Sequence, residues 1–93
     1  WRIEIASTGK GNHDASLSAD GRTHTGMLRY LGQPADAPST LIVLNGELGR
    51  QPAIVEIKRE PCRNAEGVDT QASVQVTMEG QPQRRGCGHL AVY

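Results

Sequence analysis

The chain has 93 residues, which is enough for one domain. Its ten basic and ten acidic residues cancel, which argues against a nucleic-acid binder and against a polybasic membrane surface, because both need an excess of Lys and Arg. The sequence has one Trp, two Tyr and no Phe, so its core has to be built mainly from aliphatic side chains. It also has no apolar stretch long enough for a transmembrane helix.

Alternating polar and apolar residues predict strands in the first part of the chain. The clearest pattern is at the start, where Ile3 and Ile5 alternate with Arg2 and Glu4. Glycine-containing turns separate the segments, and one of them carries Asp20-Gly21, a pair typical of hairpins. The expected strands here are residues 1–7, 13–18 and 24–31.

The second part of the chain starts with an irregular loop at 32–39, which contains two prolines. The apolar run at 40–45 predicts a strand buried on both faces, with a short helical turn as the alternative. Asn45-Gly46 then predicts a turn, and 63–71 reads as a polar loop. Further alternating segments predict strands at 52–60, 72–79 and 84–92.

These short strands with turn signals between them predict a single all-β domain over 1–93. The expected architecture is a small antiparallel meander, either barrel-like or a sandwich. Closing the sheet through its first and last strands would hide both edges and bring Trp1 close to Tyr93.

Cys62 and Cys87 are the only two cysteines. The favoured interpretation is a disulfide in an oxidising compartment, and closing the loop between them would stabilise the fold by roughly 3 to 4 kcal/mol. Their spacing excludes a CxxC redox motif, and the histidines do not complete a zinc finger. A nucleophile–base pair of Cys87 and His89 is the alternative. Side chains two apart on a strand stand roughly 6 to 7 Å apart, which is too far for direct proton transfer.

Other candidate sites are weak. The remaining histidines, His13 and His24, are distant in sequence, so we expect solvated side chains and no metal site. Residues 7–11 (STGKG) superficially suggest a phosphate-binding loop, but they lack the P-loop spacing and a following helix pattern. No catalytic triad, carboxylate pair or cofactor loop is recognisable. The sequence therefore predicts a protein that is not an enzyme and needs no cofactor.

Two surfaces are candidates for binding. If the cysteines are bonded, four arginines would gather at one end of the domain, where they could recognise a carboxylate, a phosphate head group or an acidic protein loop. An ordinary mixed-charge surface is the alternative. The second candidate is the irregular loop, because loops on a rigid β scaffold often carry binding residues, although it could equally be a simple connector. The residues of the arginine patch are Arg59, Arg63, Arg84 and Arg85, and those of the loop are Tyr30, Gln33 and Asp36.

One stretch carries a family resemblance. It contains Cys62, an alternating strand around Val74 and Val76, and a turn at Gly80 that is followed by Gly86-Cys87. From Glu56 to Gly88 the chain resembles a family of uncharacterised bacterial cell-envelope proteins, most of them predicted lipoproteins, and the opening strand is similar to theirs as well. Asn64 stands where that family usually has Asp, and Gln71-Ala72 where it has Tyr-Pro. The resemblance implies a Cys62–Cys87 disulfide and a periplasmic or outer-membrane-anchored location, and it implies no activity.

We therefore expect a non-catalytic cell-envelope β domain with a binding or structural role, cut from a longer secreted or lipid-anchored precursor. Its partner would be an envelope protein or an anionic ligand. The alternative is a proteinaceous inhibitor of an envelope-targeting hydrolase such as lysozyme, whose acidic cleft the arginine-bearing end would enter. Membrane-bound inhibitors of C-type lysozyme have a similar size, one disulfide and a β-barrel, which is an analogy of fold alone.

Overall fold

The computed structural model describes residues 1–31 and 41–89. The expected loop at 32–39, with Gln33 and Asp36, lies outside the described residues, and so does Tyr93 with its expected position near Trp1. In the described part, the regular elements are all β-strands, so the all-β prediction is confirmed. The bounds of the strands are β1 (Arg2–Gly9), β2 (Asn12–Ala19), β3 (Arg22–Tyr30), β4 (Leu41–Leu48), β5 (Gln51–Lys58), β6 (Cys62–Arg63), β7 (Asp69–Thr70), β8 (Ala72–Met78) and β9 (Arg84–Gly88).

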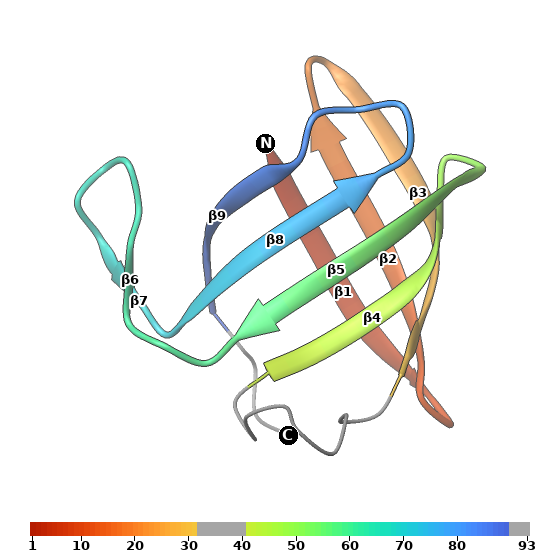
Figure 1. Cartoon of the computed structure of the whole chain (residues 1–93), viewed down its shortest axis with the longest axis horizontal. Helices are drawn as coiled ribbons and strands as arrows, with labels where there is room; N and C mark the ends of the chain where they lie inside the picture. Colours follow the sequence, from red (N-terminus) through yellow and green to blue (C-terminus); the bar gives the residue numbers. More distant parts are fainter. Residues whose placement is uncertain (32–40, 90–93) are drawn as a thin grey trace.

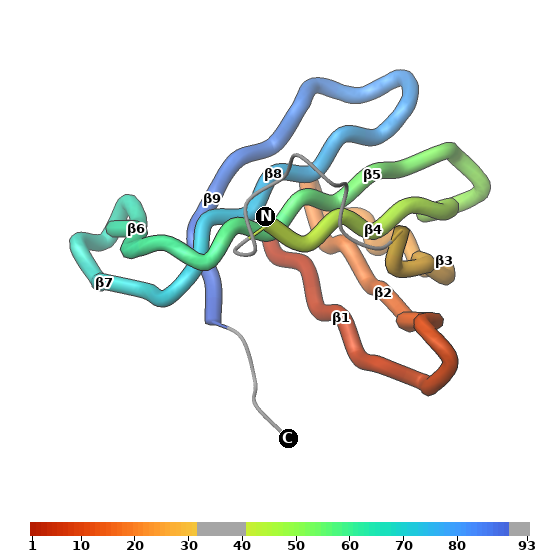
Figure 2. Tube along the Cα trace, turned by 60° about the horizontal axis from the view of Figure 1, so that its bottom comes forward, coloured from red at the N-terminus to blue at the C-terminus, as the bar shows by residue number. Residues whose placement is uncertain are grey.

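Seven of the strands form one antiparallel meander in the order β1-β2-β3-β4-β5-β8-β9. The sheet curls into a half-barrel (Figures 1 and 2), which confirms the barrel-like meander. β6 and β7 form a separate two-stranded hairpin that projects away from the sheet. No helix among the described residues is long and apolar enough to cross a membrane.

The prediction of a turn at Asn45-Gly46 is wrong, because β4 continues through this pair to Leu48. The turn comes at Gly49 and Arg50, which both have positive φ, of 57° and 69°. A glycine serves a different purpose at position 46, where a Cβ atom would collide with the backbone oxygen of Met27. Gly46 therefore allows two main chains to approach closely.

A second glycine, on the neighbouring strand, allows the same close approach of the two main chains at the β3–β4 corner of the sheet. A Cβ atom at Gly26 of β3 would collide with the backbone oxygen of Glu47 in β4. The two strands pair through only three residue pairs, from Leu28 with Gly46 to Tyr30 with Leu44. Glycines in strand interiors commonly mark such close approaches and sharp bends, and here they let the sheet curl.

The core lies on the concave face of the half-barrel, where alternate residues of each strand point inward. Three alanines leave room for the larger aliphatic side chains, which is how small barrels fill their interiors. Among the described residues, no polar or charged residue is buried as a whole. The fully buried large residues are Leu17, Leu28, Leu44, Leu48, Val55 and Val76.

Arg84 closes one end of this core. It pairs with the buried Val76 across the β8–β9 ladder and therefore shares its inward face. The side chain is only 13% exposed; its guanidinium donates to Gln81 Oε1 at 2.8 Å and forms an ion pair with Asp20 at 3.4 Å. Arg84 thus links β9 to the turn between β2 and β3.

The expected closure through the first and last strands is wrong. In the described part of the chain, β1 pairs with β2 and β9 pairs with β8, and β1 and β9 are not neighbours in the sheet. The indole of Trp1 instead reaches across the seam, which is the gap between β1 and β9. A Cβ atom at Gly86 would lie 2.8 Å from Trp1 Cζ2. A side chain, and not a ladder of backbone hydrogen bonds, thus connects the two strands.

Candidate binding cleft

The half-barrel opens into a cleft of about 910 Å³ between β1 and β9. This volume lies in the range of protein ligand sites, about 300 to 1,000 Å³. The floor of the cleft is the inner face of the sheet. The aliphatic side chains of this floor are Ile3, Ile5, Ile42, Leu44, Ile57 and Val74.

Polar residues lie at the rim of the cleft. Arg2 of β1, Arg63 of the hairpin and Arg85 of β9 contribute positive charge, and Glu66 contributes a carboxylate. Arg2 forms an ion pair with Glu4, and Arg63 pairs with Asp69 at 2.9 Å. Arg85 has no carboxylate within 4.0 Å in the described part of the chain, and its guanidinium donates only to Gln83 Oε1, at 3.3 Å.

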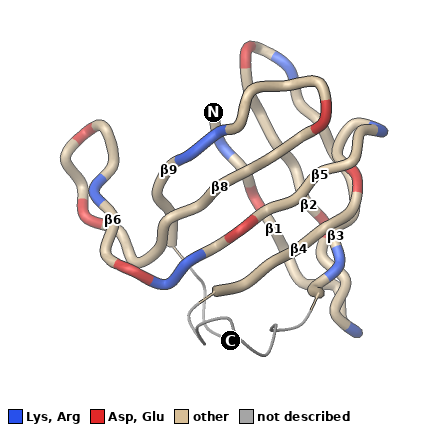
Figure 3. Tube along the Cα trace, in the orientation of Figure 1, with Lys and Arg blue, Asp and Glu red and all other residues tan. Residues whose placement is uncertain are grey.

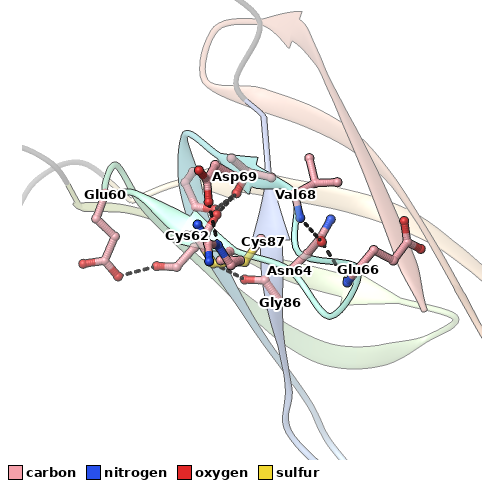
Figure 4. Close-up of a disulfide and its surroundings, with 12 residues drawn as sticks. Glu60, Cys62, Asn64, Glu66, Val68, Asp69, Gly86 and Cys87 are labelled. Carbon is pink, nitrogen blue, oxygen red and sulfur yellow. Dashed lines mark hydrogen bonds and ion pairs between the residues drawn. A yellow bond between two sulfur atoms is a disulfide. The ribbon is translucent and has the colours of Figure 1, made fainter.

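The Cys62–Cys87 disulfide is present, as the sequence predicts. It joins the start of the hairpin to β9, where Cys87 pairs with Ser73 on the outer face of the sheet. The sulfur of Cys62 lies 3.8 Å from the carbonyl oxygen of Gly86, so the bond holds the hairpin beside the cleft (Figure 4). Because Cys87 is bonded, it has no thiol to act as a nucleophile with His89.

The hairpin is a turn built around Asn64. Its Oδ1 accepts hydrogen bonds from the backbone N–H groups of Glu66 and Val68, both at 3.0 Å. Gly67 adopts a φ of 81° and donates to the carbonyl oxygen of Asn64. Asn favours this geometry, because its short side chain can hydrogen-bond to the backbone two residues further on. Asn64 and Gly67 carry this signal in the sequence, and the prediction of a polar loop over 63–71 misses the two short strands.

Two interactions tie the base of the hairpin together. Thr70 Oγ1 donates to the carbonyl oxygen of Cys62 at 3.0 Å, and Arg63 Nε donates to Asp69 Oδ1 at 2.9 Å (Figure 4). Val68, near the tip, is 50% exposed. The hairpin is therefore an ordered projection with an exposed apolar residue.

The four predicted arginines lie in three different places. Arg63 and Arg85 both line the cleft, next in sequence to Cys62 and to Gly86-Cys87 respectively. Arg84 points inward and pairs with Asp20. Arg59 is exposed after the end of β5 and does not line the cleft. Figure 3 shows charges of both signs spread along the strands and turns, so the structure brings together two of the four.

Tyr30 lies at the end of β3 and is 40% exposed. Its backbone N–H donates to the carbonyl oxygen of Gly11, in the turn between β1 and β2. The other two residues of the predicted binding loop, Gln33 and Asp36, lie outside the described residues. Tyr30 is not among the residues that line the cleft.

His13 was expected in solvent, but it lines the cleft. Its Nδ1 is buried and has no hydrogen-bond partner among the described residues. A sequence signal exists, because His13 lies two and four residues before the buried Ala15 and Leu17 and therefore shares their face of β2. In the described residues, no three His, Cys, Asp or Glu side chains gather as a metal site.

A second groove of about 630 Å³ lies around the disulfide. Within it, Ser73 Oγ donates to Glu60 Oε1 at 2.7 Å. Arg85 lines both this groove and the apolar cleft. Arg85 therefore lies between the cleft and this groove.

Together, the fold and the cleft define a small all-β half-barrel with one disulfide and an open apolar interior. Comparisons with protein-family models, curated proteins and solved structures find no match to this chain. Its function therefore has to be inferred from the geometry of the cleft.

Proposed function

We propose that the chain is a non-catalytic binding domain of the bacterial cell envelope, and that the cleft between β1 and β9 is its binding site. The observation that carries this proposal is the aliphatic floor of the cleft, about 910 Å³ in volume and open on one side. Concave sites that are lined mainly by apolar side chains are typical of ligand binding. The polar groups at the rim would orient a partner and add specificity.

The envelope location is supported by the disulfide, because such bonds form and persist in oxidising compartments. The resemblance to cell-envelope proteins around Cys62 and Gly86-Cys87 supports the same location. Thiol trapping of the protein in fractionated cells tests this part of the proposal. We expect the oxidised form in the periplasmic or outer-membrane fraction, and a reduced cytoplasmic protein would contradict it.

Binding at the cleft is tested by mapping chemical-shift changes in the isotope-labelled domain. The probes are sodium dodecanoate and short extended peptides of alternating Val and Thr with one Asp. We expect the shifts to map to β1, β9 and the cleft floor, and Ile5→Asp to weaken binding at least tenfold, because it places a charge on that floor.

Ile54→Asp is the matched control, because Ile54 is 42% exposed on the outer face of β5. It should leave binding unchanged. If neither probe binds, or if the shifts map elsewhere, the cleft is not the binding site.

A second function, inhibition of an envelope-targeting hydrolase, is favoured by the β6–β7 hairpin. The disulfide and the Asn64 turn hold this projecting element in one shape, and a preorganised loop loses little entropy when it enters an enzyme cleft. A lysozyme activity assay with the purified domain tests this function. Inhibition that Val68→Asp removes would support it, and full lysozyme activity at micromolar domain would exclude it.

A further inference from the structure

We infer that the occupant of the cleft is an extended polypeptide segment of a partner protein, which pairs with both β1 and β9 and closes the half-barrel. This inference rests on the proposed function, because it assigns a partner to the same cleft. It goes further, since it requires main-chain hydrogen bonds that a small amphiphilic ligand cannot make.

The two strands that border the cleft are both sheet edges. In the described residues, β1 forms a ladder with β2 alone, and β9 forms a ladder with β8 alone. Among the described residues, each strand therefore has a row of N–H and C=O groups without a ladder partner on its free side, and such a row is a template for another strand. Peptides commonly bind to proteins by adding a strand to an edge of this kind.

The strand directions favour one added strand. The six consecutive pairings from β1 to β9 are all antiparallel, so β1 and β9 run in the same direction. A segment that runs the opposite way would pair antiparallel with both. It would complete a closed, fully antiparallel barrel, an architecture that has no free edges.

On the inner face of β9, Gly88 leaves room for a side chain of such a segment, whereas Gly86 is covered by the half-exposed indole of Trp1, which has to swing outward. The inward positions of β9 nearest the cleft are Gly86 and Gly88, which pair with the inward-facing Val74 and Ala72. Opposite them, β1 contributes Ile3 and Ile5 to the floor. Apolar side chains at alternate positions of the partner would pack against these isoleucines and Gly88, and would displace the Trp1 ring from Gly86.

Charge and polarity at the cleft complement a peptide with an acidic residue. Arg85 points outward from β9 and lacks a carboxylate partner among the described residues. An Asp or Glu at an outward position of the added strand would be its cross-strand neighbour.

A tethered strand tests the inference at high effective concentration. The donor Thr-Val-Thr-Val-Asp-Val-Thr is joined after Tyr93 by a Gly/Ser linker of about ten residues, which gives an effective concentration in the millimolar range. We expect the melting temperature to rise by about 4 °C or more. Hydrogen exchange should slow at alternate amides of both β1 and β9, and the fluorescence of Trp1 should change.

The matched control is the same donor with each Thr replaced by Pro. It keeps the three valines and the aspartate but removes three of the four N–H donors that face one of the two edge strands, so it cannot form ladders with β1 and β9 at the same time. An unchanged melting temperature with this control, together with a rise for the donor, supports strand addition.

An equal rise for donor and control would overturn strand addition and leave apolar binding in the cleft, the proposed function, intact. No rise for either would overturn it as well. The dodecanoate titration of the untethered domain then decides separately whether the cleft binds a small amphiphile.

Discussion

Glycine residues in the strands of this domain serve two different packing purposes. Gly26 and Gly46 lie where the main chains of β3 and β4 approach each other, whereas Gly86 lies under the indole of Trp1. The difference decides how a substitution is tolerated. A side chain such as Trp1 can move away from an added methyl group, but a backbone oxygen held in a ladder cannot.

At Gly46, replacement by Ala should reduce the free energy of unfolding by about 3 kcal/mol or more, because the added Cβ collides with the backbone of Met27. Urea denaturation measures the change. Gly88→Ala is the control, since the nearest atom to its Cβ would be Val74 Cγ2 at an ordinary 3.5 Å. Equal effects of the two substitutions would contradict the close approach at the β3–β4 corner.

At Gly86, replacement by Ala should change the position of Trp1 more than the stability. The added Cβ would lie 2.8 Å from Trp1 Cζ2, and the ring is 48% exposed, so it can swing outward. We expect a red-shifted Trp emission and a loss of stability below about 1 kcal/mol. The emission of the Gly88→Ala variant should remain at the original wavelength, and so should that of Gly86→Ala if the contact across the seam does not exist.

At the scale of an element, the β6–β7 hairpin depends on hydrogen bonds within itself and on its link to β9. Asn64 Oδ1 accepts from two backbone N–H groups. The hairpin makes few contacts with the main sheet, so it should open locally without unfolding the domain. Its order therefore depends largely on one side chain and one disulfide.

Replacing Asn64 with Ala removes both acceptor interactions, each contributing about 1 kcal/mol. We expect the amides of Glu66 and Val68 to exchange with solvent at least tenfold faster, while the amides of β5 and β8 keep their protection. Asn64→Asp keeps an acceptor oxygen and should exchange nearly as slowly as the parent. Faster exchange throughout the sheet would show that the hairpin is not an independent unit.

The sequence predicted the strands of the meander well, because the alternation of polar and apolar residues is the pattern expected for a sheet with one buried face. Its errors came from residues with more than one structural use. Asn45-Gly46 has the composition of a turn, yet Gly46 is required for a close approach inside β4. The hairpin was overlooked because two-residue strands carry no periodic pattern.

The candidate site was less predictable, because the cleft floor combines side chains from β1, β4, β5 and β8, which are far apart in the sequence. The disulfide follows from a count of the cysteines, and it does place Arg63 and Arg85 at one cleft. Arg84 shows that residues next to each other in the sequence need not contribute to the same site. It is adjacent to Arg85 in sequence, but the alternation of a strand turns it to the opposite face, toward Asp20.

At the scale of the whole molecule, one covalent bond constrains an open sheet. The Cys62–Cys87 bond joins residues 25 apart and links the hairpin to an edge strand. The loop-entropy model assigns such closure about 3 to 4 kcal/mol. This is a large share of the 5 to 15 kcal/mol that typically separates folded from unfolded domains.

Reduction of the disulfide should therefore lower the free energy of unfolding by about 3 to 4 kcal/mol. Chemical denaturation with and without reductant measures the difference. The double variant Cys62→Ala, Cys87→Ala should show the same reduced stability in both conditions, which controls for effects of the reductant itself. A parent domain that is equally stable when reduced would contradict the stabilising role of the bond.

The common direction of β1 and β9 also limits how the chain could be circularly permuted. In a circular permutant opened at the β2–β3 turn, the new connection would have to travel from His89 back to Arg2, along the length of an eight-residue strand. That distance needs about seven extended residues. The shortest connector would thus lie in the gap between β1 and β9. Its sequence would decide whether it pairs with both strands and so turns the permuted domain into a closed barrel.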